Sequence, residues 1–295
     1  RARSTPTPPS VLWMSDFQFA STPPDAVQLV AERPALDNSG VGLTVSGLGD
    51  VNGDTFEDVA IAAPDADVDD LTGAGKVFVI YGGPTDDMSA VLEQLQQDVT
   101  LGDSLLDGNN GFVVNGNAAG QRLGTSVTGA GFMNNDRNAD FAVGFVEDGT
   151  ERGGAYLIFG SDILPAVLDV GEVGDTNNGA TVAGVVITGA ADGDRAGAAL
   201  AGGGDFTGNG FNELLVGAPN WNSGFGAGYV VFGSALGVGS GSSVQLRSLA
   251  PTRGVRILGE ASGDLLGTSV NGIGDFNGDG IDDIALGAPG ADSGA

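Results

Sequence analysis

The 295-residue sequence contains no cysteine and no histidine. Without cysteine there is no disulfide framework, no thiolate zinc site and no cysteine nucleophile. Without histidine there is no Ser-His-Asp triad, no imidazole metal ligand and no imidazole acid or base. Positive charge is also scarce, because 11 lysine and arginine residues face 38 aspartate and glutamate residues, for a formal net charge of -27. Such a chain repels polyanions, so nucleic acid and anionic membrane surfaces are disfavoured as partners.

Long apolar runs are absent as well, since no stretch of about 18 apolar residues predicts a membrane-spanning helix or direct membrane insertion. With 41% hydrophobic and only 17% charged residues, the composition is that of a globular protein rather than of a disordered acidic tail. Residues 1–10 have no initiating methionine and no apolar signal core, and the chain stops at 290–295 inside a repeated pattern. We therefore expect a piece of a longer protein.

Four similar segments recur along the chain, at Gly47–Pro64, Gly129–Gly144, Gly202–Pro219 and Gly272–Pro289. Each holds an acidic loop whose first position falls at residue 50, 132, 205 or 275. Short β-branched or aromatic runs, separated by glycine, asparagine and aspartate turns, surround each loop and predict strands. The expected strands are 43–48, 59–62, 76–81 and 112–115 in the first unit, 126–130, 141–145, 155–159 and 182–188 in the second, 198–202, 214–216, 228–232 and 255–258 in the third, and 269–273 and 284–286 in the fourth.

Four short strands per unit of about 70 residues are typical of a β-propeller blade. A solenoid has shorter repeats, and a β-sandwich does not repeat one acidic loop at a fixed place. We predict an all-β propeller of four-stranded antiparallel blades, with three whole blades and partial blades at both ends. Residues 11–19 and 26–31 would belong to a preceding blade, and 87–97 has the spacing of a short amphipathic helix. The partial blades either join in a four-bladed ring or belong to a larger ring, which the bare ends favour.

The acidic loop has the chemistry of a calcium site. In 275–283, oxygen-bearing side chains fall at positions 1, 3, 5 and 9, with glycine at positions 4 and 6. Alternate side chains of a tight turn face one centre, glycine permits the positive φ of the turn, and position 7 adds a backbone carbonyl. Six or seven hard oxygen ligands suit Ca²⁺ better than Mg²⁺, and no soft ligand suits zinc or copper. An EF-hand loop differs, because its glutamate is at position 12 and helices flank it.

The candidate ligands are Asp50, Asn52, Asp54, the Phe56 carbonyl and Asp58 in the first loop (50–58), Asn134, Asp136, Asn138 and Asp140 in the second (132–140), Asp205, Thr207, Asn209, the Phe211 carbonyl and Glu213 in the third (205–213), and Asp275, Asn277, Asp279, the Ile281 carbonyl and Asp283 in the fourth (275–283). The second loop has Phe132 at position 1 and lacks that ligand. Because carboxylate number sets affinity, we expect the order first ≈ fourth > third > second. The alternative, an Asx-rich turn without metal, leaves crowded like charges unexplained.

The residues around these loops resemble the FG-GAP repeat of integrin α-subunit β-propellers and their bacterial relatives. The matching features are Leu266-Gly267, Gly287–Pro289, Gly217–Pro219, Phe159-Gly160, Phe232-Gly233 and the stretch 106–116, whereas Ala62–Pro64 and Gly144–Val146 depart from the pattern. The resemblance covers about residues 26–295 and leaves 1–25 as a proline-rich linker or poorly ordered segment. It implies a propeller, usually seven-bladed, with Ca²⁺ in loops on one face, partner-binding loops on the other and a secreted or cell-surface location.

The sequence therefore predicts a calcium-binding, non-catalytic, extracellular β-propeller scaffold for cell adhesion or for interaction with a protein or glycan ligand. The alternative is an accessory propeller module of a secreted hydrolase, because FG-GAP repeats also accompany phospholipase-type enzymes. Hydrolysis by paired carboxylates needs no histidine. However, the acids outside the loops, such as those at 65, 67, 69 and 70, form a turn-like run typical of a solvated loop rather than of an active site.

Overall fold

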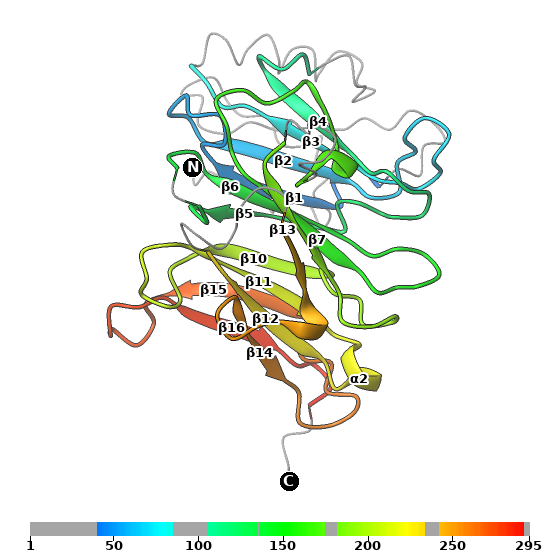
Figure 1. The fold of residues 1–295 in the computed structure, drawn as a ribbon, viewed down its shortest axis with the longest axis vertical. Coiled ribbons are helices and arrows are strands. Elements are labelled where there is room, and N and C mark those ends of the chain that lie inside the picture. Colours follow the sequence, from blue (N-terminus) through cyan, green and yellow to red (C-terminus); the bar gives the residue numbers. More distant parts are fainter. Residues whose placement is uncertain (1–39, 85–105, 135, 175–181, 234–241, 292–295) are drawn as a thin grey trace, which may run out of the picture.

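The computed structural model describes residues 40–84, 106–134, 136–174, 182–233 and 242–291. Within these ranges the chain is almost entirely β, with one short α-helix, α2 (Trp221–Gly224). The strands form three sheets of four or five strands and one two-stranded sheet. In Figure 1 the sheet of the first unit lies at the top, that of the second unit in the middle, and those of the third and fourth units at the bottom. The predicted fold class, all-β with propeller-type blades, is confirmed.

Each complete unit contains four antiparallel strands in chain order. The strands are β1 (Thr44–Gly49), β2 (Asp58–Ala63), β3 (Lys76–Ile80) and β4 (Gly111–Asn115) in the first unit, β5 (Ser126–Gly131), β6 (Asp140–Phe145), β7 (Gly154–Ile158) and β9 (Gly184–Thr188) in the second, β10 (Ala199–Gly204), β11 (Glu213–Ala218), β12 (Ala227–Phe232) and β14 (Gly254–Leu258) in the third, and β15 (Ser269–Gly274) and β16 (Asp283–Gly287) in the fourth. Every strand expected within the described ranges is present. The three four-stranded units and the two-stranded fourth unit agree with the repeat.

Two sheets carry a fifth strand that the repeat does not predict. Strand β8 (Val167–Asp169) pairs in parallel with β4, and β13 (Ser242–Gln245) pairs in parallel with β9. Each added strand comes from the connection between the third and fourth strands of the following unit. A 3-10 helix follows each one directly: η2 (Val170–Glu172) after β8 and η3 (Leu246–Ser248) after β13. We call each such strand, with its 3-10 helix, a strap, because it covers the outer edge of the preceding unit.

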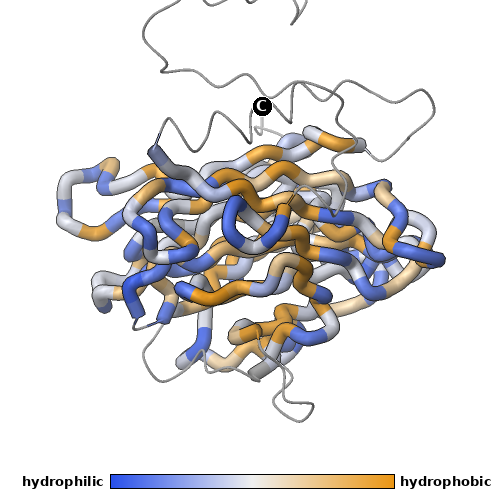
Figure 2. The backbone as a smooth tube through the Cα atoms, turned by 90° about the horizontal axis from the view of Figure 1, so that it is seen from above, coloured by the Kyte–Doolittle hydropathy of each residue, from blue (hydrophilic) through white to orange (hydrophobic). Residues whose placement is uncertain are grey.

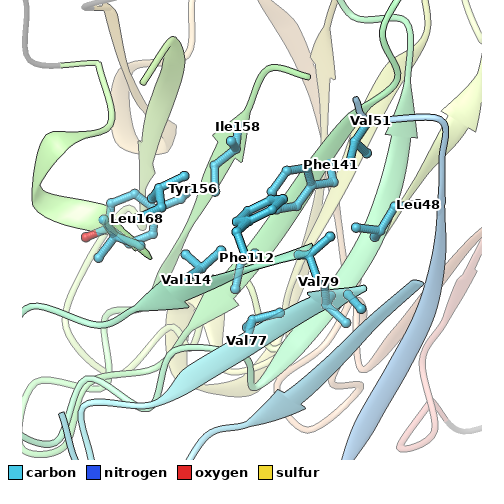
Figure 3. Close-up of a cluster of buried hydrophobic side chains, with 14 of the residues drawn as sticks. Leu48, Val51, Val77, Val79, Phe112, Val114, Phe141, Tyr156, Ile158 and Leu168 are labelled. Carbon is cyan, nitrogen blue, oxygen red and sulfur yellow. The ribbon is translucent and has the colours of Figure 1, made fainter. Parts of the chain in front are cut away.

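Three of the four clusters of the described hydrophobic core lie between neighbouring sheets, whereas the fourth lies within the first unit, around Phe78 and Ile80 of β3. Figure 3 shows the largest cluster, in which Phe112 of β4 faces Phe141 of β6. Their ring centroids are 6.0 Å apart, and both side chains are fully buried. Figure 2 shows how hydropathy varies along the backbone: apolar segments lie in the strands, and hydrophilic segments lie in the loops around them. Since the aromatic pair belongs to two units, neither unit can bury its sheet face alone.

Glycine allows the first strands of successive units to lie backbone to backbone. A Cβ atom at Gly129 of β5 would lie 2.8 Å from the carbonyl oxygen of Leu48 in β1. A Cβ atom at Gly202 of β10 would lie 2.7 Å from the Cα of Ala130 in β5. Both residues sit three positions before an acidic loop. The repeated glycine is therefore a packing requirement that also brings the acidic loops of neighbouring units together.

Several expected elements lie outside the described residues. These are the N-terminal segment 1–25, the strands expected at 11–19 and 26–31, and the helix expected at 87–97. Within the described ranges, Val270 of β15 and Ile284 of β16 pack on the apolar cluster of the third unit, beside Leu215 of β11. The number of blades in the intact ring and the domain boundaries stay predictions.

Candidate metal centres in the acidic loops

Each acidic loop starts at the same irregularity of the sheet. The pairing of the first two strands shifts register between Gly47 and Gly49, and the same shift occurs in the other three units. Gly49 has a φ of 82°, a conformation that glycine adopts without strain. The loop then returns to the sheet at position 9, which is the first residue of the second strand in every unit. Positions 1 and 9 are thus held by the sheet itself.

The position-1 carboxylate organises the turn of the first and fourth loops. In the first loop, Asp50 accepts hydrogen bonds from the backbone N–H groups of Gly53 (2.7 Å), Asp54 (3.1 Å) and Thr55 (2.8 Å). Asp275 accepts the equivalent three bonds in the fourth loop, at 2.7, 2.9 and 2.9 Å. The two loops that the sequence ranks highest therefore share one geometry.

Positions 3 and 5 contact one another directly. Asn52 donates through Nδ2 to Asp54 Oδ2 at 2.9 Å, while Asp54 Oδ1 accepts from the N–H of Phe56 at 2.8 Å. The same side-chain pair joins Asn277 to Asp279 at 3.0 Å and Asn134 to Asp136 at 2.7 Å. In the third loop the contact differs, because Thr207 Oγ1 and Asn209 Nδ2 both donate to Glu213 Oε1, at 3.2 and 3.4 Å. The spacing of the sequence pattern thus corresponds to real proximity in all four loops.

The position-9 acid is buried in three of the four loops, where Asp58, Asp140 and Glu213 are at most 2% exposed. Asp58 accepts from the N–H of Val51 through Oδ2 and from the N–H of Gly82 through Oδ1, both at 2.8 Å. Burial raises the pKa of each of these three acids to about 7, and the negative charges of neighbouring loop acids add to the rise. Each of these three loops therefore holds a carboxyl group whose charge is poorly compensated by the surrounding protein.

Within the described ranges, no group of three or more Asp or Glu side chains converges closely enough to hold a metal ion. The carboxylates instead accept hydrogen bonds from backbone N–H groups and from the side-chain amides of the loops. This arrangement still leaves acceptor capacity, because each carboxylate oxygen has two lone-pair directions and one N–H occupies only one. The side-chain groups that could coordinate a metal in these loops are all hard oxygens, the ligand class that Ca²⁺ prefers. The donor chemistry fits calcium, although the described geometry is not that of a closed site.

Neighbouring loops are linked through their positions 1 and 8. The position-8 N–H donates to the position-1 carbonyl of the preceding loop, from Ala139 to Asp50 at 2.7 Å, and equivalently between the second and third and the third and fourth loops. In the last two pairs the position-8 side chain completes a second bond. Asn212 accepts from the N–H of Phe132 at 2.7 Å, and Asp282 accepts from the N–H of Asp205 at 3.0 Å. The four loops therefore form one connected row.

One acid beside the loops was not among the predicted ligands. Asp162 follows the third strand of the second unit and accepts through Oδ1 from Nδ2 of Asn138 at 3.0 Å. The same oxygen would lie 2.6 Å from a Cβ atom at Gly53, so Asp162 stands between the first and second loops. The antiparallel pairing of β6 and β7 could have indicated this position, because it brings the end of the third strand to the start of the second.

The acids outside the loops behave as a solvated turn, as expected. Asp67 accepts from the N–H of Gly73 at 2.8 Å, and Asp65 pairs with Arg122 at 3.0 Å on the surface. These contacts cap a turn and tie it to the next unit. Both acids therefore take part in structural contacts of the turn. Among the described helices, none has the length and apolar character needed to cross a membrane.

Comparison with known proteins identifies the repeat. The family model described as FG-GAP repeat matches the chain in three places, at residues 41–80, 196–231 and 267–295. The chain is also 31% identical over 175 residues to integrin alpha-PS2 of Drosophila melanogaster. That similarity covers 57% of this chain but only 11% of the integrin subunit, so the chain spans a small part of that relative's length. The three matches contain the first, third and fourth acidic loops.

Proposed function

We propose that this FG-GAP repeat protein, which resembles an integrin α-subunit, is a calcium-binding, non-catalytic β-propeller scaffold for adhesion outside the cell. The observation that carries the proposal is the row of four acidic loops, each with oxygen-only donors placed at equivalent points of the sheet. The three buried position-9 acids support it further. Burial raises the pKa of each to about 7 by disfavouring the carboxylate, and a bound cation would stabilise that charged form.

In the first loop, Asp50, Asn52, Asp54 and Asp58 would hold the ion, with the carbonyl of Phe56. The corresponding residues of the fourth loop would hold a second ion, and the third and second loops would bind more weakly. Calcium would supply two positive charges at a place where up to four carboxylates, three of them proposed ligands, lie within nine residues. Its role would be structural, since the ion would fix the hairpin that joins the first two strands of each unit.

An extracellular setting agrees with this type of site. Calcium-binding modules that work outside the cell have dissociation constants of about 0.1–1 mM, and solvent-exposed loops with two or three carboxylates belong to that range. The similarity to integrin alpha-PS2 supports an adhesion role. The ligand class that we propose is a protein or a glycan met by loops away from the calcium row. The absence of histidine and cysteine, together with the structural use of the acids, supports a non-catalytic role.

The test is a calcium titration of the whole chain by isothermal calorimetry, combined with thermal unfolding in EDTA and in calcium. Saturation of one site at 100 times its dissociation constant stabilises the fold by about 2.7 kcal/mol, which corresponds to a rise of about 5–10 °C in a domain of this size. The double variant Asp50→Asn, Asp275→Asn should lose most of this rise.

The matched control is Asp69→Asn, which removes the same charge from the turn outside the loops. It should keep the full calcium response. Calcium is added to about 10 mM, well above the dissociation constants of extracellular modules. If it then produces neither heat nor a change in melting temperature, the proposal is contradicted. A response that all variants share equally would place binding outside the acidic loops and would also contradict it.

A further inference from the structure

A cleft of about 690 Å³ opens between the second and third units, a size within the range of roughly 300–1,000 Å³ of small-molecule sites. Its walls are the connection from β9 to β10 and the connection from β11 to β12, which contains α2. In antiparallel units these connections lie at the end of the sheets opposite to the acidic loops. Helix α2 marks that end at the lower right of Figure 1. Both units that form the cleft have all four strands.

The equivalent junction between the first and second units is closed. There, a Cβ atom at Gly120 would lie 3.0 Å from the Cβ of Asp148. Gly193 is the equivalent of Gly120, and a Cβ atom at Gly193 would meet nothing within 4 Å. Trp221 follows β11 at the same distance at which Asp148 follows β6. The cleft is therefore a feature of this one junction and does not follow from the repeat.

Contacts from both sides fix the wall that contains α2. Asn222 and Ser223 have φ angles of 50° and 62°, a left-handed conformation that costs a non-glycine residue about 1–2 kcal/mol. Asp194 of the opposite wall, which is 4% exposed, accepts from the N–H of Ala191 at 2.8 Å and from the N–H of Asn222. Ser262 Oγ donates to the Ser223 carbonyl at 2.8 Å. Strained residues that their surroundings hold in place are typical of ligand sites.

The charges of the cleft favour a neutral ligand. Asp194 already accepts two backbone N–H groups, and Asp192 accepts through Oδ1 from Nε and Nη2 of Arg152 at 2.9 and 2.7 Å. Among the described residues, no lysine or arginine lines the cleft. A phosphate, sulfate or carboxylate group would therefore meet two acids and no cation in the lining. A cationic group would have to compete with Arg152 for Asp192.

The other polar residues of the cleft suit hydroxyl groups. Asn220 and Asn222 carry amides and Ser223 carries a hydroxyl, and each of these groups can both donate and accept. Trp221 adds a large apolar ring with one N–H donor. This ring is held in place, because it packs against the apolar cluster between the two units and lies 5.3 Å from the guanidinium carbon of Arg256. A sugar offers the complementary surface, with hydroxyl groups around its ring and C–H groups on its face.

We propose that this cleft binds a neutral glycan. Asn220, Asn222 and Ser223 would bind its hydroxyl groups, and Trp221 would pack against a sugar ring. The inference rests on the adhesion function proposed above and names its ligand class, a glycan rather than a protein. It goes beyond calcium binding, because no residue of the acidic loops takes part.

Tryptophan fluorescence and calorimetry on the whole chain test the site. The chain has two tryptophans, so the variant Trp13→Phe leaves Trp221 as the sole emitter. The probes are neutral tetrasaccharides of glucose, mannose, galactose or N-acetylglucosamine, each added to about 10 mM so that a Kd as weak as about 1 mM is detected. We expect at least one of them to change the emission of Trp221 and to give a measurable Kd.

Two cleft variants and one control locate the binding. Trp221→Ala should raise the Kd about tenfold or more, and its melting temperature shows whether the variant folds, because Trp221 also packs on the core. Asn220→Ala, which leaves that ring in place, should raise the Kd about fivefold. The control is Phe132→Ala, which removes a 49% exposed aromatic side chain at the acidic-loop end of the second unit. It should change the Kd by less than about twofold.

Three results would overturn the proposal. No probe binds, or a probe binds with a Kd that neither cleft variant changes, or a charged probe binds more tightly than every neutral one in a manner that Asn220→Ala weakens. The charged probes are a sulfated tetrasaccharide and an arginine-containing tetrapeptide. Each titration is run in EDTA and in calcium, with the melting temperature recorded. A calcium response without sugar binding contradicts the cleft alone, and sugar binding without a calcium response contradicts the calcium sites alone.

Discussion

The substitution Asp58→Asn should make the protein more stable than the natural chain in EDTA and less stable than the natural chain in calcium. Asp58 begins β2, is 2% exposed and accepts two backbone N–H groups, one from Val51 and one from Gly82. Asparagine has nearly the same shape but no charge. In EDTA the change removes a buried anion. In calcium it removes a proposed ligand.

The magnitude in EDTA follows from two opposing effects. Burial raises the pKa of Asp58 from 3.8 to about 7, so at pH 8 the charged group destabilises the fold by about 4 kcal/mol relative to an ordinary carboxylate. The asparagine NH₂ group, however, must face one of the two N–H donors, and an unsatisfied buried donor costs about 1–3 kcal/mol. We therefore expect Asp58→Asn to be more stable than the natural chain by about 1–3 kcal/mol in EDTA at pH 8.

Acidification provides a second measure of the same effect. The pKa of Asp58 is higher in the folded state than in the unfolded state, so between about pH 4 and pH 7 the fold binds more protons than the unfolded chain. The stability of the natural chain in EDTA should therefore rise as the pH falls from 8 to 5. Asp140 and Glu213 contribute in the same direction. Asp58→Asn should show a smaller rise, because one of the three groups is gone.

The assay is urea unfolding of both proteins, in EDTA and in calcium, at pH 8 and pH 5.5. With calcium at pH 8 the natural chain should become the more stable protein, and at pH 5.5 much of its calcium response should be lost, because protons compete for the same carboxylate. The reasoning on the buried charge would be refuted by two results together. Asp58→Asn would be less stable than the natural chain in EDTA at pH 8, and calcium would raise its free energy of unfolding by as much as that of the natural chain.

Three further predictions test the loop order and the packing. In a calorimetric calcium titration, Asp50→Asn should remove one of the tighter binding steps, whereas Asp136→Asn should affect only the weakest step; the reverse result would contradict the affinity order. Phe112→Ala should lower the free energy of unfolding by about 3–5 kcal/mol, because it empties a fully buried position between two sheets, and a loss below about 1 kcal/mol would contradict this. Gly129→Ala should destabilise by about 1–3 kcal/mol, since its Cβ would lie 2.8 Å from a carbonyl oxygen of the preceding unit. Its equivalent in the first unit, Gly47, has nothing within 4 Å of that position, so Gly47→Ala should unfold at nearly the same urea concentration as the natural chain.

Much of the fold could be predicted from the sequence, because each strand is a β-branched or aromatic run between strong turn residues and the pattern occurs four times. The straps could not be predicted in the same way. Their strands, VLD at 167–169 and SSVQ at 242–245, are three and four residues long and show no extended alternation of their own. They are strands because the edge of the preceding unit is available, and that edge is a property of tertiary structure.

The loops show the same division between local and distant causes. Spacing alone identified the residues at positions 1, 3, 5 and 9, and the structure brings the predicted side chains into contact. The burial of Asp58 and the place of Asp162 were not accessible from spacing, since they depend on Gly82 and Asp162, which follow the third strands of their units, reaching the loops. Local sequence therefore predicts which side chains lie together in a loop, while residues that follow the third strand of the same unit determine the burial and the surroundings of those side chains.

Three kinds of contact join successive units: the strap, the apolar core and the hydrogen bond between acidic loops. The following unit supplies the strap on the outer edge, the facing half of the apolar core, and the position-8 N–H that binds the preceding acidic loop. A unit is therefore complete only when its successor is folded, and the acidic loops are connected through the backbone rather than independent. Because the position-1 carbonyl and the position-1 carboxylate belong to the same residue in the first and third loops, an ion bound there would act on the residue that also holds the next unit. An ion bound in the acidic loops and the contacts between the sheets would then stabilise the same structure.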